Sequence, residues 1–199
     1  PAAVAIFAKA PGAGLAKTRL IPLLGAVGSA RAQRGFTLRT LATARSASTG
    51  EVTMWCAPDT RHRFFRAMAQ RHGVNTMAQP AGDLGQRMAE AMAHHFARSP
   101  HTPLLIVGTD CPALTLQHIQ QAADALQSVD VVLIPAEDGG YVLIGLRRPV
   151  PEVFTDVPWS TPQVLTQTRE RLRAAGVGWR ELQTLWDVDE PADWLRWRS

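Results

Sequence analysis

Cysteine is scarce in this sequence: only two cysteines occur in 199 residues. Cys56 and Cys111 each lie in an apolar run and are expected to be small buried hydrophobic residues. This number excludes a disulfide-stapled scaffold. A chain that does not depend on disulfides suits a reducing compartment, so we expect a cytoplasmic location.

Long hydrophobic runs are also missing. No stretch approaches the ~20 apolar residues that a membrane helix needs, so no membrane insertion is expected. The apolar start of the chain, residues 1–8, is too short for a secretory signal and is closely followed by Lys9 and Pro11. With 46% hydrophobic residues, the chain can bury a sizeable core, and we expect one domain over residues 1–199.

Blocks of positive charge are absent as well. The net charge is +4, but the arginines are scattered singly along helix-like segments, without interleaved aromatic residues. We therefore expect a solvated basic surface that favours small anionic ligands, and no nucleic-acid partner. Lysine is scarce: of 21 basic residues only Lys9 and Lys17 are lysines, and both lie in one Gly/Pro-rich loop. Such clustering predicts a chemical role, and chance is the alternative.

Apolar, strand-like runs alternate with helix-like segments along the chain. Strands are expected at 4–7, 52–56, 74–77, 104–107, 131–134, 141–146 and 179–185. Helices are expected at 26–47, from a cap at 58–60 to 71, at 83–98, 115–127 and 160–174, and from Pro191. This alternation predicts a three-layer α/β/α fold with a mostly parallel sheet. Ligands of such sheets bind at the carboxyl ends of the strands, where the distinctive polar residues of this chain lie.

The loop from Lys9 to Leu20 carries the strongest functional signal. Its glycines allow backbone N–H groups to approach phosphate oxygens closely. Lys17 adds a compact positive charge and Arg19 a bidentate fork. Neither the three-glycine dinucleotide fingerprint nor the P-loop is matched. The loop therefore predicts a site for nucleotide phosphates that matches neither of these motifs. The alternative is a flexible connection with two exposed cations.

Five motifs in this order are similar to those of a known family: Ala16-Lys17-Thr18-Arg19-Leu20, Gly108-Thr109-Asp110-Cys111-Pro112, Asp138-Gly139-Gly140-Tyr141, Trp159-Ser160-Thr161-Pro162 and Asp187-Val188-Asp189-Glu190-Pro191. They resemble the DUF2064 family of bacterial glycosyltransferase-like proteins, some from arsenosugar or radical-SAM gene contexts. The resemblance covers nearly the whole chain. It implies membership of the nucleotide-diphospho-sugar transferase superfamily, with the glycosyltransferase-A type fold. The Ala-Lys-Thr-Arg-Leu string also resembles the guanylyltransferase for phospholactate.

The resemblance implies a divalent metal, Mg²⁺ or Mn²⁺, because glycosyltransferases of this superfamily usually carry an Asp-x-Asp motif. Here the sequence reads Gly108-Thr109-Asp110-Cys111-Pro112, which departs from that motif and leaves Asp110 as one firm carboxylate. Mg²⁺ takes oxygen ligands from one or two carboxylates together with phosphates and water. Asp187 and Asp189 could supply the rest if the last strand persists to Asp189. That segment is similar to the end of sugar-acid cytidylyltransferases. Capping of the last helix by Asp189 or Asp193 is the alternative.

The remaining candidate contacts follow from these assignments. The expected catalytic residues are Lys17, Arg19 and Asp110. Nucleotide contacts are expected from Ala8, Lys9, Gly12, Gly14, Lys17, Arg19, Gly85 and Arg87, the last two because a helix start can bind anions. Acceptor contacts are expected from Asp138, Gly139, Gly140, Tyr141, Trp159, Ser160 and Thr161. For Asp138-Gly139-Gly140 a plain turn, and for Trp159 simple packing, are the alternatives.

Three functions remain open on the sequence. The first is glycosyl transfer from a nucleotide-sugar to a small acceptor, which the family resemblance favours. The second is nucleotidyl transfer from a nucleoside triphosphate to an anionic substrate with release of pyrophosphate, which Lys17 and Arg19 favour. Both need cations that neutralise charge on the leaving phosphate. The third is a nucleotide-binding module without catalysis, against which the presence of Asp110 and Asp189 speaks.

Overall fold

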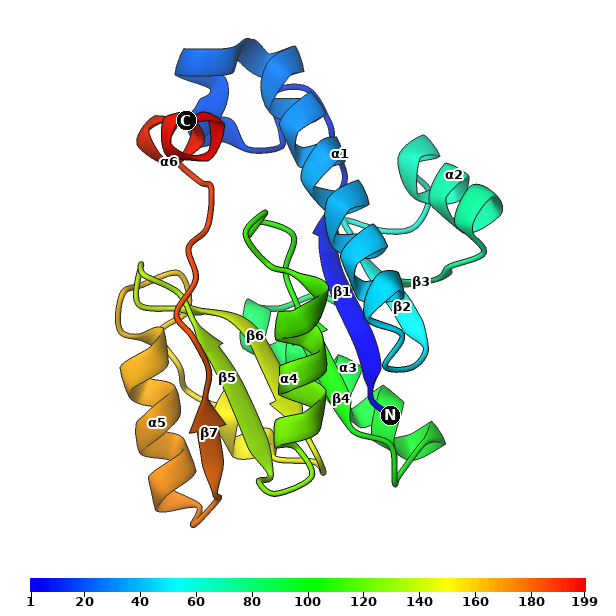
Figure 1. The fold of residues 1–199 in the computed structure, drawn as a ribbon. Helices are drawn as coiled ribbons and strands as arrows, with labels where there is room; N and C mark the ends of the chain where they lie inside the picture. The colour runs from blue at the N-terminus through cyan, green and yellow to red at the C-terminus, as the bar shows by residue number, and fades with distance from the viewer.

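The computed structural model describes residues 1–199 and contains one seven-stranded sheet (Figure 1). The strands are β1 Ala3–Lys9, β2 Val52–Ala57, β3 Asn75–Ala78, β4 Leu104–Val107, β5 Val131–Pro135, β6 Tyr141–Leu146 and β7 Trp179–Glu181. Their order across the sheet is β3-β2-β1-β4-β6-β5-β7. All neighbours pair in parallel except β6, which runs antiparallel to β4 and β5. The expected mostly parallel sheet is confirmed.

Helices cover both faces of this sheet. They are α1 Ile21–Ala47, α2 Arg63–His72, α3 Leu84–Arg98, α4 Leu116–Ala125, α5 Val164–Ala174 and α6 Pro191–Arg198, with 3-10 turns at Thr18–Leu20 and Pro151–Phe154. One core packs α1, α2 and α4 against the sheet, and the other packs α3 and α5 against its opposite face. The three-layer expectation is therefore confirmed. None of the helices combines the length and apolar character needed to cross a bilayer.

The central strands are apolar throughout because both of their faces are covered. In β4, Leu105 and Val107 belong to the core under α1 and α4, whereas Leu104 and Ile106 belong to the core under α3. The sheet is so tightly packed at Gly145 of β6 that a Cβ atom there would lie 2.4 Å from Val132 Cγ1. Only glycine fits that position without displacing its neighbours.

Several helix starts differ from the expectation. Helix α1 begins at Ile21 rather than Ala26 and changes direction at Gly25, whose φ is 70°. Helix α2 begins at Arg63 and is capped by His62, because Asp59 instead accepts bonds from Arg61. Helix α5 begins at Val164, after a turn formed by residues 160–163. The capping box of Asp83 and Gln86 at the start of α3 is present as expected.

The last strand is shorter than expected, and this changes how the C-terminal carboxylates are placed. Strand β7 ends at Glu181, and only an isolated bridge between Leu185 and Ala136 continues the pairing. From there residues 186–190, here called the strap, cross towards α1 and lead into α6 (Figure 1). Val188 is buried with Leu20 and Phe36, against which Trp194 of α6 also packs. After it leaves the sheet, the strap therefore packs against α1.

Candidate functional site

A cleft of about 1120 Å³ opens at the carboxyl ends of β1, β2, β3 and β4. Its walls come from the loop after β1, the start of α3, residues 108–110 after β4, and Asp189 of the strap. Of the expected nucleotide contacts, the cleft is lined by Ala8, Lys9, Gly12, Lys17, Arg19 and Arg87. This volume is slightly above the range of about 300–1,000 Å³ that is typical of small-molecule sites. These residues therefore lie together at the strand ends, where the sequence predicts that a ligand binds.

The loop after β1 is folded on itself. The N–H groups of Leu15 and Ala16 both donate to Gly12 O, and that of Gly12 donates to Ala10 O. These three N–H groups are therefore not available to a phosphate, and the loop does not present an unbroken run of free N–H groups. The N–H groups of Ala13 and Gly14 have no backbone partner. Gly14, with φ of 77°, adopts a conformation that favours glycine.

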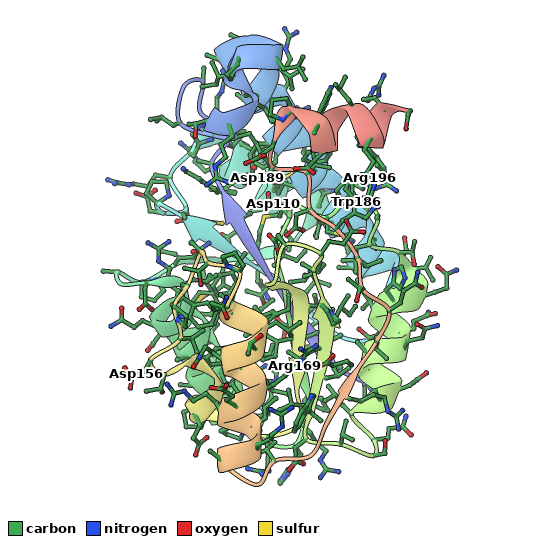
Figure 2. All side chains as sticks on the ribbon, turned by 90° about the vertical axis from the view of Figure 1, so that its left-hand side faces the viewer. Asp110, Asp156, Arg169, Trp186, Asp189 and Arg196 are labelled. Atoms are coloured by element: carbon green, nitrogen blue, oxygen red, sulfur yellow. The ribbon has the colours of Figure 1, made fainter.

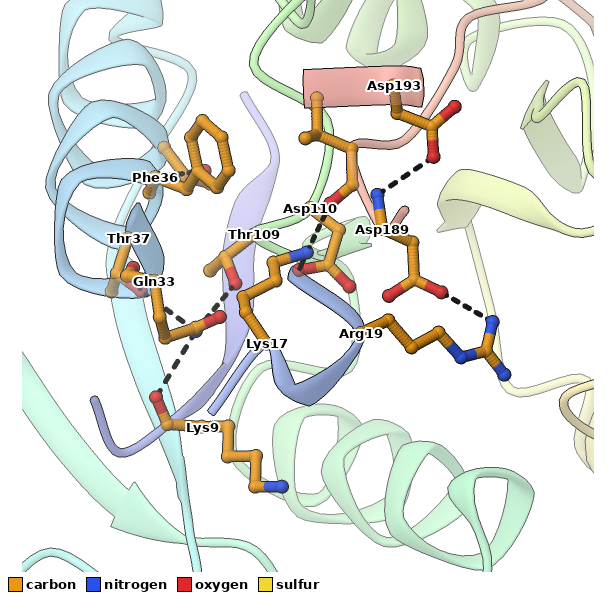
Figure 3. Close-up of polar contacts among 12 residues, drawn as sticks. Lys9, Lys17, Arg19, Gln33, Phe36, Thr37, Thr109, Asp110, Asp189 and Asp193 are labelled. Carbon is orange, nitrogen blue, oxygen red and sulfur yellow. Dashed lines mark hydrogen bonds and ion pairs between the residues drawn. The ribbon is translucent and has the colours of Figure 1, made fainter. Parts of the chain in front are cut away.

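The side chain of Lys17 is buried, so this residue does not fit the alternative interpretation of a flexible connection with two exposed cations. Only 3% of its side chain is exposed, and its Nζ lies 2.7 Å from Asp110 Oδ1 (Figure 3). The same ammonium donates to Val188 O at 2.5 Å and lies 5.7 Å from the centre of the Phe36 ring. A buried ammonium is costly without partners. Through Asp110 and Val188, Lys17 links the loop after β1 to the segment after β4 and to the strap. Asp110 keeps 51% of its side chain exposed to the cleft.

Arg19 forms the second cross-link of the cleft. Its NH1 donates to Asp189 Oδ2 at 2.8 Å, and Glu190 Oε1 lies 3.7 Å away. Both Arg19 and Asp189 are well exposed, so the pair contributes little to stability. It can therefore exchange with a charged ligand at small cost. Lys9, by contrast, is exposed and forms no ion pair.

The strap brings Asp187 and Asp189 to the edge where Asp110 lies. Val188 N donates to Asp110 O at 2.8 Å, which anchors the strap beside β4. Asp193 Oδ2 accepts from the N–H groups of Asp189 and Glu190. Glu190 is the N-cap of α6 and Asp193 completes its capping box, which leaves the Asp189 carboxylate to Arg19. Figure 2 places Asp110 and Asp189 next to one another. A backbone contact of the strap, and not a continuation of the last strand, brings Asp189 towards Asp110.

Burial and neighbouring negative charge raise the pKa of Asp187 to about 7, with Asp110, Asp138 and Asp189 as the neighbours and Lys17 opposing them. A second cavity of about 210 Å³ is lined by Asp110, Asp187 and Tyr141. Carboxylates that repel one another in this way have the chemistry of a divalent-cation site. As the side chains stand, however, no group of three acidic, histidine or cysteine residues has the geometry to hold an ion.

Of the expected acceptor residues, Tyr141 lines a cavity, whereas Asp138 and Trp159 contact other residues of the chain. Tyr141 lines the second cavity, and its hydroxyl lies 3.9 Å from Met88 Sδ. Asp138 Oδ1 accepts from Gly140 N at 2.9 Å, which stabilises the turn between β5 and β6. Trp159 packs edge-on against Tyr141. Neither cavity at Asp110 is lined by Trp159, Ser160 or Thr161.

Gly139 and Gly85 are required by close packing. Gly139 has φ of 92°, and a Cβ atom there would lie 2.2 Å from Pro162 O. A Cβ atom on Gly85 would lie 2.4 Å from Trp159 Nε1, so this residue faces Trp159 and not the cleft. The segment from Trp159 to Pro162 therefore packs closely against both glycines.

Substitution of Gly139 by alanine is expected to destabilise the fold by at least about 2 kcal/mol, because both the positive φ and the contact with Pro162 oppose a side chain. Urea unfolding monitored by tryptophan fluorescence measures this. Gly178→Ala is the matched control, since its Cβ would meet open space and its φ is not in the left-handed region. Equal stability of the two variants would contradict the packing argument.

Several cleft residues were missed by the sequence analysis, and three of them are polar residues that form hydrogen bonds beside the cleft. Gln33 and Thr109 are buried polar residues that line the cleft. Gln79, just after β3, donates to Trp55 O at 2.9 Å, and its Oε1 lies 3.4 Å from Arg87 NH1. The available signal was the placement of Gln79 and Thr109 directly after predicted strands. Gln33 gave none, because it lies within a helix and its neighbours in the cleft are distant in sequence.

Residues 40–161 match the model of the family DUF2064, described as uncharacterized proteins conserved in bacteria. The chain belongs to the DUF2064 family. This DUF2064 chain is similar to a crystal structure from Desulfovibrio desulfuricans G20 that is assigned as a nucleotide-diphospho-sugar transferase. The two share 29% identity and a TM-score of 0.85, over 95% of this chain and 82% of that one. No curated protein matches the chain.

More distant structures share the fold. CMP:2-keto-3-deoxy-manno-octonic acid synthetase, solved in complex with CTP, is 18% identical with a TM-score of 0.60, over 100% of this chain and 97% of that one. A Mycobacterium tuberculosis H37Rv protein in complex with manganese is 15% identical with a TM-score of 0.56, over 98% and 97%. The architecture is thus that of nucleotide-diphospho-sugar transferases and cytidylyltransferases.

Proposed function

We propose that this protein is a metal-dependent transferase that uses a nucleotide donor, and that it moves a glycosyl group from a nucleotide-sugar to a small acceptor. The observation that carries the proposal is the cleft, in which Lys17, Arg19 and Asp110 meet at the carboxyl edge of the parallel strands. The similarity to the Desulfovibrio structure over 95% of the chain supports sugar transfer.

The side chains have separate tasks in this proposal. Arg19 and the exposed Lys9 would bind the diphosphate of the donor, and the free N–H groups of Ala13 and Gly14 would add hydrogen bonds. Lys17 would hold Asp110 in place and lower the negative potential where charge builds up on the leaving phosphate. The acceptor would enter beside Tyr141 and Asp187, where the smaller cavity adjoins Asp110.

The residues present fit a divalent cation, because Asp110, Asp187 and Asp189 offer hard oxygen ligands at one edge and the phosphates would complete the set. Such an ion, Mg²⁺ or Mn²⁺, would supply electrostatic stabilisation of the leaving phosphate. The fold is shared with a manganese-bound protein, which supports this assignment. Asp110 would hold the ion through Oδ2, the oxygen that Lys17 does not contact, and Asp189 would hold it after its ion pair with Arg19 has loosened.

Nucleotidyl transfer is the second candidate. The phosphate loop with Lys17 and Arg19 favours it, and the fold is shared with a cytidylyltransferase that binds CTP. In that case the donor would be a nucleoside triphosphate and pyrophosphate would be released.

A thermal-shift screen of nucleoside triphosphates and nucleotide-sugars, with Mg²⁺, Mn²⁺ or EDTA, tests the proposal, because a ligand of the native state raises the unfolding midpoint. Stabilisation by a nucleotide-sugar, followed by metal-dependent transfer or hydrolysis of that donor, is the expected result. Release of pyrophosphate would instead establish the second candidate. Stabilisation without any turnover would leave a binding module, and no stabilisation at all would overturn the nucleotide assignment.

Arg19→Ala is expected to weaken binding of the best ligand at least about tenfold, because one charge-assisted contact to phosphate is lost. The unfolding midpoint without ligand should hardly change, since Arg19 is exposed. Isothermal titration calorimetry measures the affinity. The matched control is Arg98→Ala, an exposed arginine at the opposite end of α3. Equal affinities of the two variants would show that the loop does not bind phosphate.

A further inference from the structure

Two buried polar side chains form part of the cleft wall and have hydrogen-bonding capacity to spare. Gln33 on α1 and Thr109 after β4 are each only 4% exposed, yet both line the cleft. They come from elements far apart in sequence and meet beside the end of β1 (Figure 3). Buried polar groups are normally paired, and Gln33 Oε1 is not among the buried side-chain atoms that lack a partner, so this oxygen is open to the cleft.

The orientation of the Gln33 amide is fixed by its neighbours. Its Nε2 lies 3.2 Å from Lys9 O and 3.3 Å from the hydroxyl oxygens of Thr37 and Thr109. Lys9 O is a carbonyl oxygen that can only accept, so the NH₂ end must face it. The carbonyl end, Oε1, then points away from Lys9, and no group of the chain donates a hydrogen bond to it.

The two threonine hydroxyls of this network differ in one respect. Thr37 donates its proton to the main-chain O of Gln33 at 2.9 Å. Thr109 accepts from Gln33, but its own proton has no acceptor in the chain. The cleft wall therefore contains one acceptor, Gln33 Oε1, and one donor, the Thr109 hydroxyl, that have no partner in the chain.

A ligand group must both donate and accept to satisfy this pair. A phosphate oxygen can only accept, and an ammonium group can only donate, whereas a hydroxyl group does both. We propose that Gln33 and Thr109 bind one hydroxyl group of a sugar ring, whose proton goes to Gln33 Oε1 and whose oxygen accepts from Thr109. This inference rests on the proposed function. The ring is either the ribose of the nucleotide or the sugar attached to its diphosphate.

The test measures affinities with Mg²⁺ by titration calorimetry. The probes are ATP, GTP, CTP and UTP with their 2′-deoxy and 3′-deoxy forms, and UDP-glucose and GDP-mannose with analogues that lack one hydroxyl of the attached sugar. A site built to bind a hydroxyl discriminates against the analogue that lacks it. We expect at least about tenfold tighter binding of the hydroxyl-bearing member of one such pair. Thr109→Val should bring that ratio close to one, whereas Thr109→Ser should keep it.

Thr37→Val is the matched control, because Thr37 is buried in the same network but does not line the cleft. This variant should retain the discrimination of the parent. A ratio that depends on the 2′- or 3′-hydroxyl identifies the ribose, and one that depends on the attached sugar identifies the donor sugar. Either supports the inference.

Two results would overturn it, and they are distinguishable. If nucleotides bind but the parent does not discriminate, or Thr109→Val discriminates as the parent does, the hydroxyl site is wrong and the proposed function stands. The parent measurement decides this even if Thr109→Val does not fold. If none of the nucleotides binds, the proposed function fails and the hydroxyl site with it.

Discussion

Replacing Asp187 by asparagine is expected to stabilise the metal-free protein at pH 8 by up to about 4 kcal/mol, the limit that a pKa change from 3.8 to about 7 sets. Burial and the carboxylates of Asp110, Asp138 and Asp189 disfavour the ionised form in the folded state. The unfolded chain has no such penalty, so ionisation of Asp187 opposes folding.

The pH dependence follows from the direction of this shift. Because the folded pKa is raised, the favourable contribution of protonated Asp187 is fully present below about pH 3.8. It is lost progressively as pH rises to about 7 and stays lost above that. The advantage of Asp187→Asn should therefore be large at pH 8 and vanish near pH 4.

Urea unfolding in EDTA between pH 4 and 8 measures this difference. Asp124→Asn, an exposed carboxylate on α4, serves as the control and should show no such trend. A stabilisation of Asp187→Asn that does not vary with pH would contradict the electrostatic explanation. On the proposed function the same variant should lose metal-dependent turnover, because the repulsion that destabilises the fold is what a cation relieves.

The elements that the sequence predicted well are those decided by local patterns. The apolar run of β4 and the capping box of Asp83 and Gln86 depend on neighbouring residues, and both are present in the structure. The direction of β6 was not stated, although the five residues between Pro135 and Tyr141 are too few for a parallel crossover. A hairpin was therefore implicit in the Asp138-Gly139-Gly140 turn.

The candidate site was harder to predict, because its decisive contacts join residues far apart in the chain. Lys17 meets Val188 across 171 positions, and no local pattern reveals that this lysine is buried. The approach of Asp189 was attributed to strand geometry, whereas the bond from Val188 N to Asp110 O and the packing of α6 bring it there. The residue types in the sequence indicated which residues belong to the candidate site, but tertiary packing determines which of these residues form pairs.

Asp110→Asn and Asp189→Asn are each expected to reduce the metal-dependent part of nucleotide affinity at least about tenfold. Both carboxylates line the same cleft and would hold one ion on the proposed function. In the ligand-free protein they are neutralised by Lys17 and Arg19 at 2.7 and 2.8 Å. A nucleotide that attracts Arg19 to its phosphates releases Asp189, so metal and nucleotide should bind together more tightly than either alone.

Titration calorimetry with Mn²⁺ alone, with nucleotide in EDTA, and with both provides the measurement. Because the two carboxylates would serve one ion, the double variant should lose little more affinity than the worse single variant. Glu190→Gln is the matched control, since Glu190 lies 3.7 Å from Arg19 but does not line the cleft. It should keep nearly the parent affinity. Independent, additive losses in the double variant would mean that Asp110 and Asp189 do not share an ion, and the loss in Asp110→Asn would then reflect its pairing with Lys17.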